Sequence, residues 1–285
     1  MVRACLDGLR VERGAMRAAQ FVFILGVAAW TVARLSGAEG PAPAPAQKVV
    51  WNGYERINFT LGGERGVLVQ PKTPAPGRPW LLRSEFFEQQ PGVDLALLER
   101  GWHIASVEAN HLYGSRKAMA VYNQFYAHLI TYASLSERVV VAGFGRGALN
   151  AANFAATQPR RVAALYLDAP VLDIRSWPGP QRPKEWAECL EAHGLNEKSL
   201  AQFRGNPLDR ITPISSGRIP VIIIAAEADG TVSFAANTGL FEQRYKAAGG
   251  TIQVIRKPGS EHVPHSLSDP QPVLAFLTEK AVMTR

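Results

Sequence analysis

The chain has 285 residues, of which 47% are hydrophobic and 19% are charged, and its formal net charge is +7. These proportions are those of an ordinary globular protein, and the length suits one α/β domain of about this size. Five arginines against two acids give the first 38 residues a net charge of +3, which leaves +4 for the rest. Because the sequence has no dense Lys/Arg cluster, we expect no nucleic-acid partner.

The first 38 residues have the pattern of a secretory signal peptide. Arg10, Arg13 and Arg17 precede an uncharged run over residues 18–33, and small residues then permit cleavage after Ala38. The run of 16 residues is shorter than the roughly 20 that a membrane span needs. We therefore expect an exported, periplasmic or extracellular protein, with an uncleaved N-terminal membrane anchor as the alternative. The true start is either Met1 or Met16.

A Pro/Ala-rich stretch follows the expected cleavage point. Residues 39–48 predict an extended linker, so the predicted folded body is residues 49–285. Cleavage would remove Cys5 and leave Cys189 alone, which excludes an internal disulfide in the mature chain.

Apolar runs and helical patterns alternate through the body. Short runs that predict strands lie at residues 57–61, 67–69, 80–82, 103–107, 139–141, 162–167, 219–226 and 251–255. Segments with helical spacing lie at residues 93–100, 115–132, 148–157, 234–248 and 272–280. This alternation predicts an α/β fold with a doubly wound, mostly parallel sheet of eight strands. Residues 173–210 fall between two core strands and are predicted to form a small cap insertion.

The stretch from Arg138 to Pro159 organises the body. A buried strand leads into Gly143-Phe144-Gly145-Arg146-Gly147, and an Ala-rich helix follows. Strand, Gly-rich turn and helix form a nucleophile elbow, G-x-S-x-G, whose serine attacks the substrate. Here the middle residue is Gly145, which has no side chain to act as a nucleophile. Glycine tolerates the strained backbone of an elbow, so we expect the fold to survive while covalent catalysis is lost.

An acid and a base follow two later strands. Asp229 comes after the strand at 219–226, and His262 lies in a loop after the strand at 251–255. Ligands of parallel sheets bind beyond the carboxyl ends of the strands, so these residues are candidates for chemistry. Nucleophile position, acid, base is the chain order of an α/β-hydrolase. The carboxylate orients the imidazole, and the pair can activate a water molecule directly for weak ester hydrolysis.

From about Pro79 to Pro272 the chain resembles exported bacterial proteins of the α/β-hydrolase superfamily, of the esterase-like or prolyl-oligopeptidase-like kind. The resemblance is carried by Glu85-Phe86-Phe87, Leu112-Tyr113-Gly114-Ser115, Gly143 to Leu149, Leu167 to Val171, Ser176-Trp177-Pro178-Gly179, Asn206-Pro207-Leu208-Asp209 and His262 to Leu267. In that family the elbow is G-x-S-R-G, from which this chain departs at Gly145. The resemblance implies that Asp229 and His262 occupy the acid and base positions. It also implies an oxyanion hole of backbone N–H groups near Ser84 and Arg146.

Other residues are candidates for contacts with a substrate. Arg146 binds an anionic group of the substrate or pairs with a carboxylate such as that of Glu85. Trp177 in the cap stacks on a sugar or belongs to a small cap core. His265 supports His262 or is a polar loop residue. The expected partner is a small molecule, either an ester or a carbohydrate-derived ligand.

Three other interpretations stay open. Gly143-x-Gly145-x-x-Ala148, with Asp168 at the end of the next strand, also satisfies a dinucleotide-binding pattern. The second interpretation is a non-catalytic ligand-binding protein on the hydrolase fold. A relocated nucleophile is the third, although none of its candidates lies on an elbow: Ser84, Ser106, Ser115 and Ser260. We expect no cofactor and no metal site, because His262 and His265 alone are too few ligands.

Overall fold

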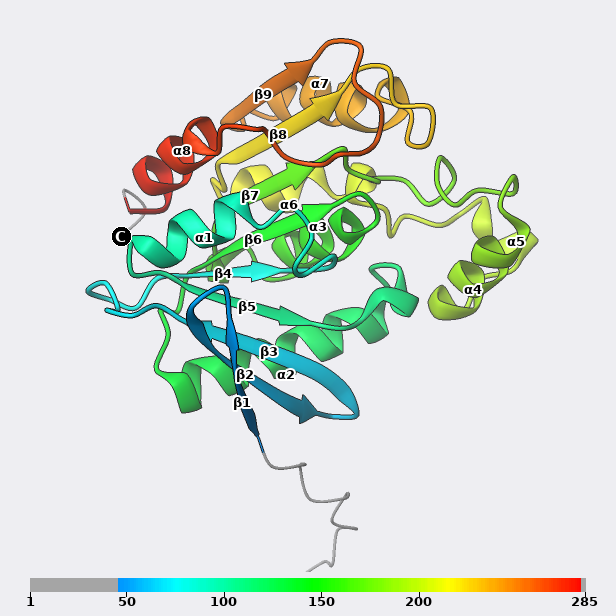
Figure 1. Cartoon of the computed structure of the whole chain (residues 1–285). Helices are drawn as coiled ribbons and strands as arrows, with labels where there is room; N and C mark the ends of the chain where they lie inside the picture. The colour runs from blue at the N-terminus through cyan, green and yellow to red at the C-terminus, as the bar shows by residue number, and fades with distance from the viewer. Residues whose placement is uncertain (1–45, 283–285) are drawn as a thin grey trace, which may run out of the picture. The chain divides into compact units, whose positions relative to one another are not determined.

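The computed structural model describes residues 46–282, so the predictions for the signal peptide and most of the linker lie outside the described residues. One sheet of nine strands runs through this part of the chain, in the order β1-β2-β3-β5-β4-β6-β7-β8-β9 (Figure 1). The strands from β5 to β9 pair in parallel, whereas β1, β2 and β3 join the sheet antiparallel. This is the doubly wound, mostly parallel α/β sheet that the sequence predicts.

The predicted number of eight strands was one too low. The strands are β1 Gln47–Trp51, β2 Tyr54–Leu61, β3 Glu64–Gln70, β4 Trp80–Arg83, β5 His103–Val107, β6 Val139–Phe144, β7 Val162–Asp168, β8 Val221–Ala226 and β9 Ile252–Lys257. The additional strand, β1, pairs with β2 across a turn at Asn52 and Gly53, whose φ angles are +48° and +79°. Positive φ at both residues is what a two-residue hairpin turn requires. Because β1 is mostly exposed, its sequence lacks the apolar pattern that marks a core strand. The linker predicted at residues 39–48 therefore includes the first two residues of this strand.

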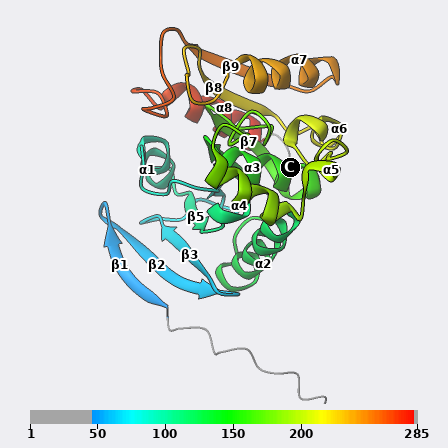
Figure 2. The same cartoon turned by 90° about the vertical axis from the view of Figure 1, so that its right-hand side faces the viewer.

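Helices cover both faces of the sheet. They are α1 Gly92–Glu99, α2 Arg116–Ala133, α3 Gly147–Thr157, α4 Pro183–His193, α5 Glu197–Leu200, α6 Ile211–Ser216, α7 Leu240–Ala247 and α8 Gln271–Val282. Side chains of α2, α3, α6 and α7 form one hydrophobic core with the sheet, and those of α1 and α8 form another. Figure 2 shows α1 on the opposite side of the sheet from α2 and α3.

Alternate residues of the central strands divide between these two cores. In β6, Val139 and Val141 contribute to the core under α2 and α3, whereas Val140 and Ala142 contribute to the core under α1 and α8. Every residue of β6, β7 and β8 is buried. A strand that is covered on both faces is apolar throughout, which is why these strands were identifiable in the sequence.

The insertion at 173–210 carries α4 and α5, which stand beyond the carboxyl ends of the parallel strands (Figure 1). It has a small hydrophobic cluster of its own, in which Trp177 and Cys189 pack with Tyr113 and with Leu149 of α3. Trp177 is only 9% exposed. Burial raises the pKa of the Cys189 thiol to about 12, so this cysteine stays protonated and is a poor nucleophile.

Between residues 46 and 282, no helix is both long and apolar enough for a bilayer span.

Candidate active site

Gly145 stands at the tip of the sharp turn between β6 and α3. Its φ angle is +47°, in the left-handed region that side chains disfavour and glycine adopts freely. Its N–H group donates to the carbonyl oxygen of Asp168 at 2.9 Å, and its own carbonyl accepts from the N–H of Val171 at 2.9 Å. Two backbone hydrogen bonds therefore fix the turn against the end of β7, and neither depends on a side chain at position 145.

The two flanking glycines let the strand and the helix of the elbow approach closely. A Cβ atom on Gly143 would lie 2.7 Å from the Cα atom of Ala148, which is closer than real Cβ contacts. A Cβ atom on Gly147 would lie 3.0 Å from the Cβ atom of Glu85 and 3.2 Å from the Oγ atom of Ser84. Close packing therefore accounts for both glycines, and no bound nucleotide is needed to explain them.

His262 and Asp229 form a hydrogen-bonded pair. The Nδ1 atom of His262 lies 2.7 Å from Oδ2 of Asp229, and Oδ1 accepts from the N–H groups of Thr231 and Val232, both at 2.8 Å. Burial by itself would raise the pKa of the Asp229 carboxyl, but the bonds from His262 and from these N–H groups outweigh it and lower the pKa. The carboxylate is therefore ionised and holds the imidazole by its Nδ1 atom.

The ring edge of His262 that carries the other nitrogen faces the nucleophile position. Its Nε2 atom lies 3.1 Å from the point where a Cβ atom on Gly145 would stand. The His262 side chain is 18% exposed, so a small molecule can reach it. The structure thus brings together Asp229, His262 and Gly145, which the sequence placed on three different strand ends.

Ser84 holds the elbow together. Its N–H donates to the carbonyl oxygen of Ala142 at 2.9 Å, and its Oγ atom lies 2.9 Å from that same oxygen and 2.7 Å from the carbonyl oxygen of Gly147. A fully buried hydroxyl engaged in this way is not placed to act as a nucleophile. The Ser84 N–H is therefore committed, whereas the N–H groups of Glu85 and Arg146, which flank the elbow, make no backbone hydrogen bond in the described structure. Both lie beside the elbow, where the sequence predicts an oxyanion hole.

The side chains of Arg146 and Glu85 pair with each other beside the elbow. The Nε atom of Arg146 lies 2.7 Å from Oε2 of Glu85, and the guanidinium also stands over the ring of Phe86. Glu85 is buried, and this burial raises its pKa to about 7 even though Arg146 favours the ionised form. The guanidinium is therefore engaged within the protein, and it offers less to an anionic substrate than a free arginine would.

His265 forms a second histidine–aspartate pair, which the sequence did not reveal. Its Nδ1 atom lies 2.9 Å from Oδ1 of Asp168, whose other oxygen accepts from the N–H of Ser266 at 2.7 Å. Asp168 is completely buried, and both of its carboxylate oxygens are engaged. It is therefore not placed to bind a ribose hydroxyl, as the dinucleotide pattern requires. The Nε2 atom of His265 lies 3.7 Å from the Cβ point of Gly145.

Three non-glycine residues around this site have a left-handed backbone. The φ angles of Phe86, Ala169 and Ser266 are +53°, +40° and +68°. Ala169 follows Asp168 directly, Ser266 donates to it, and the Phe86 ring packs 6.1 Å from that of His265. Such a conformation costs about 1–3 kcal/mol per residue and clusters at functional sites. The same conformation also occurs at Asn52, Ser134 and Arg218, away from this site, so it does not identify the site by itself.

The remaining predicted residues lie elsewhere or have structural roles. Trp177 packs 6.3 Å from the ring of Tyr113 inside the cap cluster, which matches a cap core rather than an open stacking face. Ser115 caps α2 by accepting from the N–H of Ala118. The structure of residues 46–282 contains no group of three or more His, Cys, Asp or Glu side chains that would hold a metal ion.

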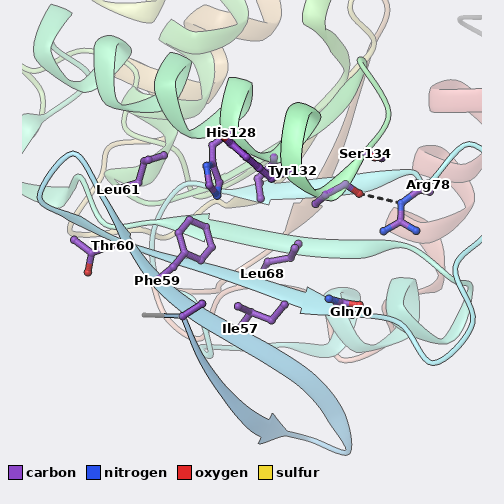
Figure 3. Close-up of a pocket in the computed structure, with 13 residues that line it drawn as sticks. Ile57, Phe59, Thr60, Leu61, Leu68, Gln70, Arg78, His128, Tyr132 and Ser134 are labelled. Carbon is purple, nitrogen blue, oxygen red and sulfur yellow. Dashed lines mark hydrogen bonds between the residues drawn. The ribbon is translucent and has the colours of Figure 1, made fainter. Parts of the chain in front are cut away.

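A separate groove of about 950 Å³ lies between β2, β3 and α2 (Figure 3). The rings of Phe59, His128 and Tyr132 line it, and Arg78 at its end donates to the carbonyl oxygen of Ala133. None of the candidate catalytic residues lines this groove. Its volume therefore does not identify it as the active site, because the converging acid, base and backbone donors are all at the elbow.

No protein-family model matches the sequence, and no curated protein matches it either. Solved structures match the fold. Porphyromonas gingivalis dipeptidyl peptidase 4 superimposes with a TM-score of 0.61 at 13% identity, over 81% of this chain and 35% of that one. An acylaminoacyl peptidase in complex with Z-Gly-Gly-Phe-chloromethyl ketone gives 0.61 at 14% identity, over 80% and 41%. Pyrococcus horikoshii acylaminoacyl peptidase gives 0.58 at 13% identity, over 84% and 42%.

The likeness to these peptidases is one of fold, because the sequence identities are so low. This chain spans 35–42% of the length of the three structures, so it corresponds to only part of each. The superpositions cover 80–84% of this chain, which includes most of its nine-stranded sheet and covering helices. The described part of the chain therefore has the α/β-hydrolase fold.

Proposed function

We propose that this protein is a weak hydrolase of small carboxylic esters, in which a water molecule takes the place of the serine hydroxyl that is missing at Gly145. The observation that supports it most is the Nε2 atom of His262, 3.1 Å from the Cβ point of Gly145. A base that is oriented by Asp229 and aimed at the nucleophile position is the part of a serine-hydrolase site that activates a nucleophile.

The proposed reaction uses groups that are already in place. The carbonyl oxygen of the ester binds to the N–H groups of Glu85 and Arg146, which stabilise the negative charge that develops on it. His262 takes a proton from water through Nε2, and the water oxygen attacks the carbonyl carbon. The tetrahedral intermediate collapses, the ester C–O bond breaks, and His262 returns the proton to the departing alcohol. Asp229 stabilises the imidazolium that forms in between.

The expected rate is low because the reaction lacks a covalent step. Serine proteases that have lost a triad residue retain roughly 10³–10⁴-fold catalysis over water, from the oxyanion hole and binding alone. Esters are the proposed substrates because an alcohol leaves more readily than the amine of a peptide. The signal-peptide pattern of residues 1–38 extends the proposal to an exported enzyme that meets its ester outside the cytoplasm.

The second candidate is a protein that binds an acyl or carbohydrate-derived ligand without turning it over. The observation that favours it is the glycine itself, since an efficient enzyme of this fold relies on a side-chain nucleophile. The buried Trp177 gives little support for stacking on a sugar, because so little of its ring is exposed. Among ligands, a carboxylic acid or ester therefore fits this site better than a carbohydrate.

The test compares three proteins that comprise residues 39–285: the parent, Gly145→Ser and His262→Ala. Each is assayed with a panel of activated acyl esters of increasing chain length. We expect slow turnover by the parent, its loss in His262→Ala, and faster turnover with an initial burst in Gly145→Ser. Parent turnover no faster than that of His262→Ala would overturn the hydrolase proposal and favour the binding protein. Inactivity of Gly145→Ser as well would contradict the assignment of the site.

A further inference from the structure

We infer that His265 is a second catalytic histidine of this site, which orients the hydrolytic water by accepting a hydrogen bond from it, and that this water is held between the Nε2 atoms of His262 and His265. The inference rests on the proposed function. It concerns a buried pair, His265 and Asp168, for which a serine-based reaction has no use.

Two imidazole nitrogens converge on one point. The Cβ point of Gly145 lies 3.1 Å from Nε2 of His262 and 3.7 Å from Nε2 of His265. The two ring centroids are 4.8 Å apart, and the ring planes stand at 78° to each other. The space directly in front of Gly145 is therefore bounded by the same atom type from two histidines.

When both rings are neutral, each carries an unprotonated Nε2 atom near this point. Each Nδ1 atom lies against a carboxylate oxygen, at 2.7 Å for His262 and 2.9 Å for His265. A carboxylate only accepts hydrogen bonds, so Nδ1 carries the proton in both rings. In the neutral ring, Nε2 then has a lone pair and no hydrogen. Two acceptors that face one point require a partner with two donors.

A water molecule has two O–H donors, whereas a serine hydroxyl has one. A water in front of Gly145 donates one hydrogen to each imidazole, and its own lone pairs are then left for the carbonyl carbon of the ester. This arrangement orients the attacking oxygen, which is the part of the task that the missing serine would otherwise perform by its covalent attachment. The glycine provides the space, and the second histidine fixes the water.

The two histidines divide the work. His262 is the more exposed, at 18% against 5% for His265, so it reaches the departing alcohol. It takes the proton of the water and passes it to the alcohol, while the water oxygen forms its bond to the carbonyl carbon. His265 accepts the second hydrogen bond throughout and ends the reaction unchanged. The rings of Phe86 and Phe144 pack 6.1 Å and 5.4 Å from its own ring and confine it.

The alternative role for His265 is structural, because its bond to Asp168 ties the loop after β9 to the end of β7. Two substitutions separate these roles. The amide nitrogen of His265→Asn replaces Nδ1 and keeps the bond to Asp168, but nothing replaces Nε2. The side chain of His265→Gln extends a polar atom toward the position of Nε2 but loses the bond to Asp168. A structural role predicts that the Asn variant is the more active, and a catalytic role predicts the reverse.

The experiment measures ester hydrolysis by the parent, His265→Asn and His265→Gln, with His128→Asn as a matched control in the remote groove. We expect kcat to fall by roughly 10²-fold in His265→Asn, with KM little changed. We also expect His265→Gln to retain more activity than His265→Asn although it melts at a lower temperature. In the Gly145→Ser background the single hydroxyl hydrogen goes to His262. There we expect His265→Asn to lower the burst rate by a factor about tenfold smaller than the factor by which it lowers kcat in the parent.

Each remaining outcome counts against the inference in a distinct way. Turnover that requires His262 but survives His265→Asn would overturn the role of His265 and leave the proposed function standing. Parent turnover that is independent of His262 would overturn both. Equal losses from His265→Asn in both backgrounds would assign His265 a structural role. Activity that a chelator abolishes and Zn²⁺ restores would place a metal ion, not a water, between the two nitrogens.

Discussion

The Nε2 atom of His262 lies 3.1 Å from the point that a Cβ atom of residue 145 would occupy, although residue 145 is a glycine. In the function proposed above, the base thus faces a nucleophile position that has no side chain. The geometry persists because backbone hydrogen bonds to Asp168 and Val171 hold the turn at Gly145. Position 145 therefore needs no side chain to keep the turn in place beside His262.

Restoring the serine is expected to restore covalent chemistry. Gly145→Ser places a hydroxyl beside His262, so the variant should react with a fluorophosphonate probe that leaves the parent unlabelled. The side chain at a φ of +47° costs about 1–2 kcal/mol, and the His262 ring must shift slightly. Intact-protein mass spectrometry and a thermal melt measure the two effects. Gly249→Ser, at a φ of +74° with no neighbour within 4 Å, is the control for backbone strain. An unlabelled but folded Gly145→Ser would contradict the site.

Close packing at the elbow predicts the cost of a methyl group at Gly143. A Cβ atom there meets the Cα and N atoms of Ala148 at 2.7 Å and 2.8 Å, and backbone cannot move aside as a flexible side chain does. We expect Gly143→Ala to lower the free energy of unfolding by about 1–3 kcal/mol. Urea denaturation measures it, with Gly92→Ala, which has open space, as the control. Equal stabilities of the two variants would show that the strand and helix are less tightly packed than described.

The buried Glu85 makes the stability of the protein depend on pH. Its pKa is about 7 in the folded protein, against the ordinary glutamate value of 4.5 that applies to the unfolded chain, because burial penalises the charge. Below pH 4.5 the group is neutral in both states. As the pH rises to 7, the unfolded chain ionises first, so stability is lost, by up to about 3 kcal/mol.

Glu85→Gln cannot ionise and should not show that loss. The free energy of unfolding of this variant, relative to that of the parent, is therefore expected to increase between pH 4.5 and pH 7.5, so that the variant becomes relatively more stable. Urea denaturation at a series of pH values measures the difference. Parallel pH profiles for the two proteins would mean that Arg146 compensates the charge of Glu85 fully.

The orientation of His262 is expected to depend on the charge of Asp229. In Asp229→Asn the amide NH₂ faces Nδ1, which forces the ring proton onto Nε2 and removes the base from the nucleophile position. In a serine protease the equivalent change lowers kcat by roughly 10⁴-fold. Because the parent is already slow, we expect Asp229→Asn to fall to the rate of His262→Ala in the ester assay. A variant that keeps the parent rate would remove Asp229 from the mechanism.

Much of the fold and part of the site were predictable from the sequence, for identifiable reasons. Strands β6, β7 and β8 are covered on both faces, so they appear as continuous apolar runs with glycines and acids at their ends. The chain order of Gly145, Asp229 and His262 therefore indicated a common site. Strand β1 was not predictable, because a mostly exposed edge strand carries no apolar pattern.

The contact between His265 and Asp168 was also beyond the sequence. It joins residues 97 positions apart, and only the folded sheet brings them together. The same applies to Ser84, whose hydroxyl turns inward to the elbow and whose N–H group is used by the sheet. An acid at the end of the strand after the elbow, together with a His-x-x-His spacing, was the available signal for the second pair. Either feature alone is too common to assign.

The most direct test of this account is rapid-quench hydrolysis of an activated acetate ester by the parent and by His262→Ala, with the protein mass recorded at each time. The account predicts that the parent releases product faster than His262→Ala, without a burst and without an acetyl group on the protein. An acetylated parent protein that forms and decays at the rate of turnover would contradict it, because another residue would then be the nucleophile. Equal rates for the two proteins would contradict it as well.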